Sequence, residues 1–320
     1  MTRTVTVAIP VLNGAGVLEA TLAAVRSQRV EGAVELLVCD SGSRDGSTEL
    51  ARSYGAEVIE ITPERFSHGG TRNLLMERSS GAYVAFLTQD AEPADDLWLE
   101  KLLAGFDVAH DVGLVFGPYR PRADASPMVA RELTEWFRSF SPDGRVRVDR
   151  LAPGDRNVPS GEALLGARGY FTDANGCVAR AAWEVVPFRP VPYAEDHVLA
   201  HDMLRAGYAK VFVPDAAVIH SHEYSSWDWL RRSFDEARAL REVYGLVEPL
   251  GPWRTPLKVW GLVGADWRYA RGERAAGRRA ASMLRRSSAH HSLRVAGAVL
   301  GSRADRLPGA LVRRLSLEGN

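Results

Sequence analysis

The residues of this chain best suited to chemistry are carboxylates and histidines at the ends of predicted strands and helices. They are Asp40, Asp90, Glu195, Asp196, His220 and His222. Carboxylate oxygens and imidazole nitrogens bind divalent metals, and both groups transfer protons in catalysis. Side chains this far apart in sequence act together only if the intervening elements bring them to one place. The pattern of strands and helices therefore decides what each can do.

Asp90 follows a run of five residues, 83–87 (Tyr-Val-Ala-Phe-Leu), that predicts a strand buried on both faces. The polar residues Thr88 and Gln89 end this run just before Asp90. In an α/β fold the carboxyl end of such a strand is the edge at which ligands bind. Aspartate is also a favoured turn residue. This strand alone therefore leaves two interpretations of Asp90, a ligand-binding carboxylate or the start of a turn.

A second carboxylate, Asp40, ends the predicted strand at residues 34–39. Two carboxylates at the tips of neighbouring strands suit a nucleotide and a metal-bound diphosphate. Arg72 follows Gly69-Gly70 near a predicted helix start, where a guanidinium and backbone N–H groups can face phosphate. Either aspartate alone is more often a turn residue, so the interpretation depends on the whole set.

His220 and His222 are two residues apart, and they lie on the same side of an extended chain because successive side chains alternate. With Asp90 they would complete a site for Mg²⁺ or Mn²⁺, whose other ligands would be substrate phosphates and water. A polar surface position is the alternative for either histidine. Glu195-Asp196 opens a predicted helix, and its alternative role is an acidic helix start favoured by the helix dipole.

Strands and helices alternate with short links through the first 116 residues. Apolar runs predict strands at residues 5–9, 34–39, 58–61, 83–87 and 112–116. This alternation predicts an α/β fold with a parallel sheet and right-handed crossovers. From residue 120 to 169 the pattern weakens into a helix and Pro-Gly loops, typical of a lid or acceptor-facing region. Residues 173–176 (Asp-Ala-Asn-Gly) predict a turn, and short strands at 211–213 and 216–219 precede a helix that runs to Tyr244.

The length and composition limit which kinds of protein this chain can be. The 320 residues suffice for one large α/β domain with an appendage, or for two domains. With 46% hydrophobic residues, 25% charged residues and zero formal net charge, the chain is ordinary for a globular protein, and we expect no nucleic-acid partner. Cys39 and Cys177 make no disulfide framework, which fits a reducing cytosol. No run approaches the roughly 20 apolar residues of a membrane span, and the first strand is too short for a signal-peptide core.

Charge is distributed unevenly along the chain. Residues 254–320 contain 14 Lys and Arg against 4 Asp and Glu, so this tail carries +10 and the remainder −10. Gly251-Pro252 is the expected boundary between a catalytic domain, residues 1–250, and a basic helical C-terminal extension, residues 251–320. Three roles for the extension stay open: attachment to an anionic membrane surface, a solvated arginine-rich face, and a contact between copies in a homo-oligomer.

Gly14-Ala15-Gly16 after the first strand invites comparison with the dinucleotide-binding fingerprint. The third glycine is absent because position 19 is Glu, and residues 10–13 lengthen the loop beyond the tight turn that the motif needs. A nicotinamide cofactor is therefore disfavoured.

Several segments together resemble the inverting family 2 glycosyltransferases in order and spacing. The shared segments are Ile9-Pro10-Val11-Leu12-Asn13, Asp40-Ser41-Gly42-Ser43-Arg44-Asp45-Gly46-Ser47, Thr88-Gln89-Asp90-Ala91, Glu195-Asp196 and Ile219-His220. More narrowly, three segments are similar to the rhamnosyltransferase branch. They are Phe66-Ser67-His68-Gly69-Gly70-Thr71-Arg72-Asn73, Leu87-Thr88-Gln89-Asp90-Ala91 and His220-Ser221-His222-Glu223-Tyr224-Ser225. The resemblance covers residues 4 to 245.

The resemblance implies a GT-A fold, a Rossmann-like sheet with flanking helices that binds a nucleotide-diphospho-sugar, and a divalent metal, Mg²⁺ or Mn²⁺. It also implies roles for single residues. The donor-binding residues would be Pro10, Asn13, Asp40 and Ser41 around base and ribose, Arg72 beside the diphosphate, and Gln89. The general base would be Asp196, with Glu195 beside it, and the metal ligands would be Asp90 and His220 or His222.

Two positions depart from the family pattern. Thr88 stands where the Asp-x-Asp metal motif has its first aspartate, so one carboxylate near the ribose and metal is missing. Ser41 replaces the second aspartate of the usual Asp-Asp-Gly-Ser. This replacement weakens any inference of uracil and leaves room for a thymine nucleotide, so both dTDP- and UDP-sugars stay open as donors.

The function expected from the resemblance is metal-dependent, inverting transfer of L-rhamnose from dTDP-L-rhamnose. The acceptor would be a hydroxyl of a cell-surface glycan or of a lipid-linked saccharide. We expect such an enzyme in the cytoplasm, peripheral on the inner face of the plasma membrane, in cell-wall or polysaccharide biosynthesis. The alternatives are another hexosyl or N-acetylhexosaminyl transferase of the same fold, a catalytically silent sugar-nucleotide-binding protein, and a nicotinamide oxidoreductase.

Overall fold

The computed structural model describes residues 4–317 apart from 158–165, 252 and 273–277. The chain divides into two compact units. The first comprises Met1–Arg122 and Leu133–His220, and the second comprises Ala123–Glu132 and Ser221–Asn320. The expected boundary at residue 251 lies inside the second unit, because helix α8 (Ser226–Tyr244) packs against α10 (Arg278–Gly301) there.

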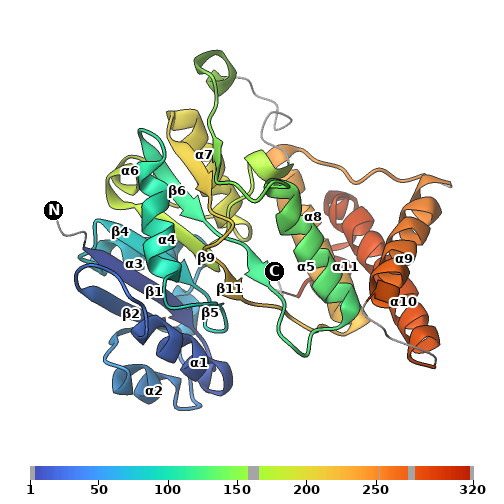
Figure 1. The fold of residues 1–320 in the computed structure, drawn as a ribbon. Coiled ribbons are helices and arrows are strands. Elements are labelled where there is room, and N and C mark those ends of the chain that lie inside the picture. Colours follow the sequence, from blue (N-terminus) through green and yellow to red (C-terminus); the bar gives the residue numbers. More distant parts are fainter. Residues whose placement is uncertain (1–3, 158–165, 252, 273–277, 318–320) are drawn as a thin grey trace. The chain divides into compact units, whose positions relative to one another are not determined.

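An eight-stranded sheet forms the centre of the first unit (Figure 1). Its strands lie in the order β3, β2, β1, β4, β9, β6, β10 and β8. In that order their bounds are Glu57–Glu60, Val34–Asp40, Val5–Val11, Tyr83–Leu87, Asn175–Ala179, Val112–Phe116, Ala209–Phe212 and Arg147–Asp149. Strands β3, β2, β1 and β4 pair in parallel, as the alternation of strands and helices predicts.

Strand β9 runs antiparallel to both of its neighbours, β4 and β6. Edge strand β8 is also antiparallel to its neighbour β10. The sheet is therefore mixed, and the predicted parallel arrangement does not extend to these two strands. A central strand is buried on both faces whichever way it runs, so an apolar sequence carries no information about its direction. Asn175 and Gly176, predicted to lie in a turn, belong to β9 instead.

Helices cover both faces of this sheet (Figure 1). The helices α1, α2 and α4 (Ala15–Arg26, Ser47–Ser53 and Trp98–Ala104) contribute to one apolar core. The helices α3, α6, α7 and the second half of α5 (His68–Arg78, Arg180–Val185, Glu195–Ala206 and Pro127–Phe140) contribute to another. Val7 and Ile9 of β1 lie in the first core and Ala8 in the second. Because side chains alternate along a strand, the two cores lie on opposite faces.

A small second sheet lies at the end of the first unit. It contains β5 (Glu92–Pro93), β11 (Val218–Ile219) and β7 (Tyr119–Arg120), in that order. β11 pairs antiparallel with β5 and parallel with β7. This sheet brings the segment before residue 220 beside the segment that follows Asp90.

The second unit is helical. It contains α8, α9 (Arg254–Gly272), α10, α11 (Gly309–Leu315) and the first residues of α5. The backbones of α8 and α10 approach closely: a Cβ at Gly297 would lie 2.2 Å from the Leu230 carbonyl oxygen, and one at Gly301 2.1 Å from that of Phe234. Glycine at both positions permits this contact. Over the described residues, none of the helices is both long and apolar enough to cross a membrane.

Candidate active site

The carboxyl ends of β1, β2 and β4 meet at one edge of the main sheet, because these strands pair in parallel. The register places Val11 opposite Asp40, and Ala8 opposite Phe86. The loops that follow these strands therefore lie together at the edge where α/β folds bind ligands. This edge carries five predicted donor-binding residues: Pro10, Asn13, Asp40, Ser41 and Gln89.

Gln89 joins two of these loops. Its Oε1 accepts a hydrogen bond from Leu12 N at 2.9 Å, and its Nε2 donates to Leu12 O at 3.3 Å. Gly14 leaves room for this amide, because a Cβ there would lie 2.7 Å from Gln89 Oε1. The Gln89 side chain thus fixes the loop after β1, a role that the sequence did not indicate.

The two carboxylate oxygens of Asp40 differ in their hydrogen bonds. Oδ1 accepts hydrogen bonds from the backbone N–H groups of Gly42 and Ser43, both at 2.9 Å. Oδ2 is buried and has no hydrogen-bond partner among the described residues. A buried acceptor without a donor is costly, so Oδ2 points to a ligand N–H or O–H group.

Asn13 and Ser41 order the loops around Asp40. The Asn13 carbonyl Oδ1 accepts from Arg44 N at 3.0 Å, and Asn13 N donates to Ser43 Oγ at 2.8 Å. Asn13 has a φ of 48°, in the left-handed region that asparagine tolerates better than most residues. The Ser41 hydroxyl donates to Val11 O at 3.1 Å. These contacts hold the donor-facing loops in one conformation.

Asp90 and His220 lie together at the ends of β4 and β11. The His220 Nδ1 is 3.5 Å from Asp90 Oδ1, and both side chains are largely buried. The pairing of Ile219 with Glu92 sets this distance, and His220 N donates to Arg120 O at 2.9 Å. The first unit therefore brings together two of the three predicted metal ligands from positions 130 residues apart.

An oxygen and an imidazole nitrogen at this distance fit Mn²⁺ or Mg²⁺ with substrate phosphates as the remaining ligands. His222 belongs to the second unit, where its ring stacks on Tyr224 with 5.1 Å between centroids. Its part in a metal site stays a prediction.

Glu195 is buried at the first turn of α7 and is held by Arg72. Arg72 Nη1 lies 2.9 Å from Glu195 Oε1, and Arg72 Nε lies 2.5 Å from Asp173 Oδ2. Arg72 is only 7% exposed. Burial by itself would lower the pKa of Arg72, but the two carboxylates outweigh burial and raise it. The predicted phosphate-facing guanidinium is therefore engaged with two acidic side chains.

Asp196 differs from its neighbour Glu195 because it is half-buried rather than buried. Its Oδ1 accepts a hydrogen bond from His197 N at 2.8 Å. Ala194, just before the pair, has a φ of 59°, which is unusual for a residue with a Cβ. Backbone strain of this kind is often found at functional sites. The sharp start of α7 places one acidic side chain in the protein interior and leaves the other accessible.

Asp173 is a residue that sequence reasoning missed, since it was assigned to a turn. It is 1% exposed and forms an ion pair with Arg72. Burial, with Asp196 and Glu195 nearby, holds the pKa of Asp173 well above its usual range despite Arg72. Because β9 is antiparallel, its first residues lie beside the ends of β4 and β6, with Asn175 opposite Leu87. The strand direction thus brings Asp173 to the site, and no local sequence signal reveals it.

The second unit contains another buried polar group, made of Arg131, Glu132, Asp266, His290, His291 and Arg294. Asp266 accepts from Arg131 Nε at 2.6 Å and contacts His291 Nε2 at 2.7 Å. Glu132 is bound by Arg294. Two carboxylates thus meet two guanidinium groups, and a divalent cation would add unbalanced charge. We assign this group a structural role.

Comparison with known proteins agrees with this geometry. Residues 6–161 match the model of Glycosyl transferase family 2. The O-antigen chain rhamnosyltransferase WbaN of Salmonella anatum is 28% identical over 75% of this chain and 70% of its own length. The O-antigen chain rhamnosyltransferase RfbN of Salmonella typhimurium is 28% identical over 84% of this chain and 80% of its own.

A solved structure of similar fold is the mannosyltransferase PcManGT of Pyrobaculum calidifontis, in complex with GDP-Man and Mn²⁺. The TM-score is 0.60 at 17% identity, over 96% of this chain and 89% of that one. The fold and the site thus define a glycosyltransferase of the GT-A fold. Residues 6–161 are similar to family 2 of these enzymes, and the chain is similar to the rhamnosyltransferase branch, as the motifs indicated.

Proposed function

We propose that this glycosyltransferase moves L-rhamnose from dTDP-L-rhamnose to an acceptor hydroxyl with inversion at the anomeric carbon. The observation that carries the chemistry is the accessible Asp196 beside a fully engaged Glu195, at the ligand-binding edge of the sheet. The sugar is inferred from two relatives named rhamnosyltransferases, which the chain matches over 70% and 80% of their lengths.

Asp196 acts as the general base. It removes the proton of the acceptor hydroxyl, whose oxygen attacks the anomeric carbon opposite the leaving nucleoside diphosphate. Arg72 neutralises Glu195, which otherwise would add a buried negative charge next to this base. A divalent metal held by Asp90 and His220 would neutralise charge on the departing diphosphate.

The donor base binds at the loops after β1 and β2. Asp40 Oδ2 is the buried acceptor there, and a nucleobase N–H is the group that it would accept. Ser41 stands where a second carboxylate would otherwise be, and its hydroxyl is tied to Val11 O. This replacement weakens the inference of a uracil nucleotide and leaves room for a thymine nucleotide as the donor.

A thermal-shift screen of nucleotide sugars, with and without Mn²⁺ or Mg²⁺, tests the donor. A ligand at a concentration of 100 times its Kd adds about 2.7 kcal/mol to the free energy of unfolding. This increase is readily measured as a higher Tm. We expect dTDP-L-rhamnose with metal to give the largest shift. A larger shift with UDP-N-acetylhexosamine or GDP-hexose would favour another transferase of the same fold. Binding without any donor hydrolysis would instead favour a silent sugar-nucleotide-binding protein.

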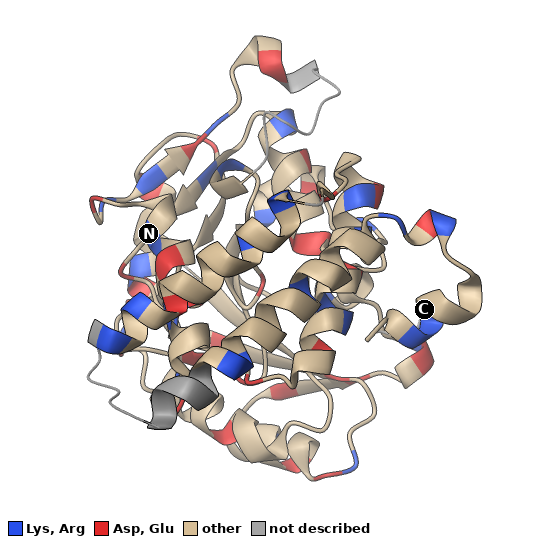
Figure 2. Cartoon of the chain, turned by 90° about the vertical axis from the view of Figure 1, so that its right-hand side faces the viewer, with Lys and Arg blue, Asp and Glu red and all other residues tan. Residues whose placement is uncertain are grey.

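The acceptor is proposed to be a glycan on a lipid carrier at the inner face of the plasma membrane. The +10 charge of residues 254–320 supports this location, and Figure 2 marks where Lys and Arg lie along the chain. Each basic residue near an anionic membrane contributes on the order of 1 kcal/mol to binding, screened by salt.

Sedimentation with liposomes tests the proposed membrane attachment. We expect anionic liposomes, but not zwitterionic ones, to carry the protein down at low salt and to release it at high salt. If the anionic liposomes leave the protein in solution, the membrane proposal is wrong. Light scattering in the same buffers tests the alternative, a contact between copies of the chain.

A further inference from the structure

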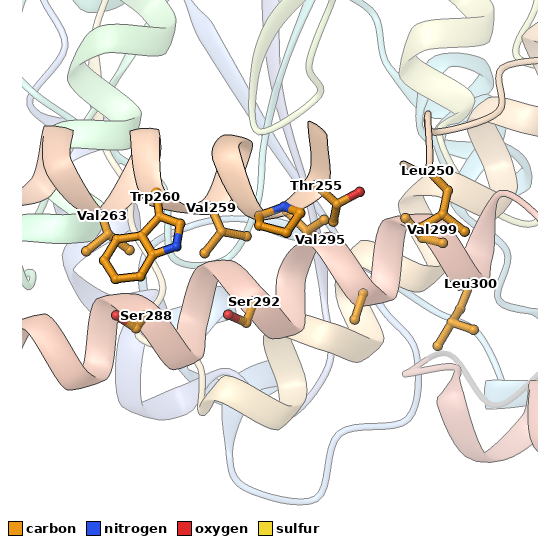
Figure 3. A pocket seen from close by; sticks show the side chains of 12 residues that line it. Leu250, Thr255, Val259, Trp260, Val263, Ser288, Ser292, Val295, Val299 and Leu300 are labelled. Atoms are coloured by element: carbon orange, nitrogen blue, oxygen red, sulfur yellow. The ribbon is translucent and has the colours of Figure 1, made fainter. Parts of the chain in front are cut away.

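A cavity of about 600 Å³ lies within the second unit, between α9 and α10. Its walls are formed mainly by Leu250, Val259, Trp260, Val263, Val295 and Val299. Figure 3 shows Val259, Trp260 and Val263 of α9 facing Ser288 and Ser292 of α10. The volume lies within the range of pockets that bind small molecules, roughly 300–1,000 Å³.

The lining of the cavity selects its ligand. Among the described residues no charged side chain lines it, and Thr255, Ser288 and Ser292 supply the side-chain hydroxyls. A sugar or phosphate inside would lose its hydration without enough partners, which is unfavourable. A partner's helix is also a poor fit, because a cylinder about 11 Å wide fills this volume within about one turn. A hydrocarbon chain fits the cavity in both respects, because it is apolar and narrower than a helix.

An exposed apolar surface continues from the cavity. Leu250 and Trp260 line it and are still 64% and 71% exposed, and Trp253 and Leu257 are 79% and 69% exposed. Leu257 and Trp260 share one face of α9, since they are three residues apart, and Trp253 is in the turn just before this helix. We call these four residues the exposed stripe. Contiguous apolar exposure marks a binding surface, and tryptophan is enriched where hydrocarbon meets water.

Basic side chains adjoin the exposed stripe. Arg254 is exposed at the start of α9, next to Trp253, and Lys258, one turn further on, forms an ion pair with Glu248. The tail beyond residue 253 carries a charge of +10. A ligand with an apolar chain and an anionic head matches both the cavity and this surrounding charge.

From these observations we infer that the cavity between α9 and α10 binds the hydrocarbon chain of an anionic lipid. This inference rests on the proposed function, because it assigns the chain of the lipid-linked acceptor to this cavity. The exposed stripe guides the chain from the bilayer, and Arg254 contacts the phosphate. The enzyme thereby holds its acceptor by a part of the molecule that takes no part in the reaction.

Equilibrium binding of the probe geranylgeranyl diphosphate, a 20-carbon chain with an anionic head, to the full-length protein tests the inference. Binding of inorganic diphosphate measures the contribution of the anionic head alone. Ser292→Phe fills the cavity from an exposed position on α10, and Ala289→Phe adds the same ring at an exposed position that does not line it. We expect at least tenfold weaker binding of the probe to Ser292→Phe, unchanged binding to Ala289→Phe, and no comparable binding of diphosphate. Trp260→Ala, also at an exposed position, should weaken binding in the same way.

Equal binding of the probe by all four proteins, or no binding by the wild type, would overturn the inference. The inference would also be wrong if the wild type is a dimer and Ser292→Phe is a monomer, because the surface would then bind a second copy of the chain. The rate of dTDP-L-rhamnose hydrolysis separates this result from the proposed function. Hydrolysis without probe binding refutes only the lipid site, whereas probe binding without donor binding or hydrolysis refutes only the proposed transferase reaction.

Discussion

Replacing Asp196 by asparagine is the most direct test of the catalytic mechanism. The amide keeps the shape of the side chain and can still accept from His197 N, so α7 should keep its start. It cannot take the acceptor proton. General-base catalysis contributes roughly 10²–10⁴-fold to the rate, equivalent to about 3–5 kcal/mol of activation free energy. We expect turnover to fall by that factor while donor affinity stays close to wild type.

Glu195→Gln should behave differently, because Glu195 is buried and forms an ion pair with Arg72. The substitution removes the ion pair between the buried Arg72 and Glu195 and leaves the contact between Arg72 and Asp173. A hydrogen bond to a charged group contributes roughly 1.5–3 kcal/mol, and for a unit of about 200 residues this corresponds to a Tm lower by roughly 3–12 °C. Glu195→Gln should therefore lose mainly stability, and Asp196→Asn mainly turnover.

The assay compares single-turnover rate, donor affinity by calorimetry and Tm for both variants. Asp202→Asn is a matched control: it makes the same change on α7, where Asp202 pairs with Arg189 near the surface, 2.6 Å from its Nε. Exposed pairs of this kind contribute about 0–1 kcal/mol, so the control should stay close to wild type. A near-normal rate for Asp196→Asn would remove Asp196 from the mechanism. A larger loss of rate in Glu195→Gln at unchanged Tm would exchange the two roles.

Three further substitutions test the site and the core. Asp90→Ala should abolish the metal dependence of donor binding, and calorimetry with an unchanged Mn²⁺ effect would contradict this. Gly14→Ala should weaken donor binding, because its Cβ would displace the Gln89 amide; wild-type affinity would show that this contact is dispensable. Burial lowers the pKa of Lys210, despite Asp149, to about 8, against 10.5 for an exposed lysine. The unfolded chain therefore binds more protons between these values, and the free energy of unfolding should gain about 3 kcal/mol from this group as pH rises from 8 to 10.5. The free energy of unfolding of Lys210→Met, measured by urea titration, should lack that gain. The same pH dependence in the variant and the wild type would refute this role of Lys210.

The sequence by itself was enough to predict the individual strands of this enzyme and the residues at their ends. Apolar runs predicted the strands that became β1, β2, β4 and β6, because burial on both faces requires such runs. Asp40 and Asp90 were placed at strand ends for the same local reason. Motif spacing was enough to indicate the family that residues 6–161 match, since these residues must follow particular strands to reach one edge of the sheet.

Tertiary structure alone decided which of the candidate side chains are free to react. Glu195 and Asp196 are adjacent acidic residues, and only the ion pair with Arg72, 123 positions earlier, distinguishes them. Gln89 reaches Leu12 rather than a ligand because parallel pairing of β1 and β4 brings their loops together. Asp173 joins the site because β9 runs antiparallel, a direction that a strand buried on both faces does not encode. Burial and ion pairing depend on segments from distant parts of the chain, whereas strand and helix patterns depend on neighbours in sequence.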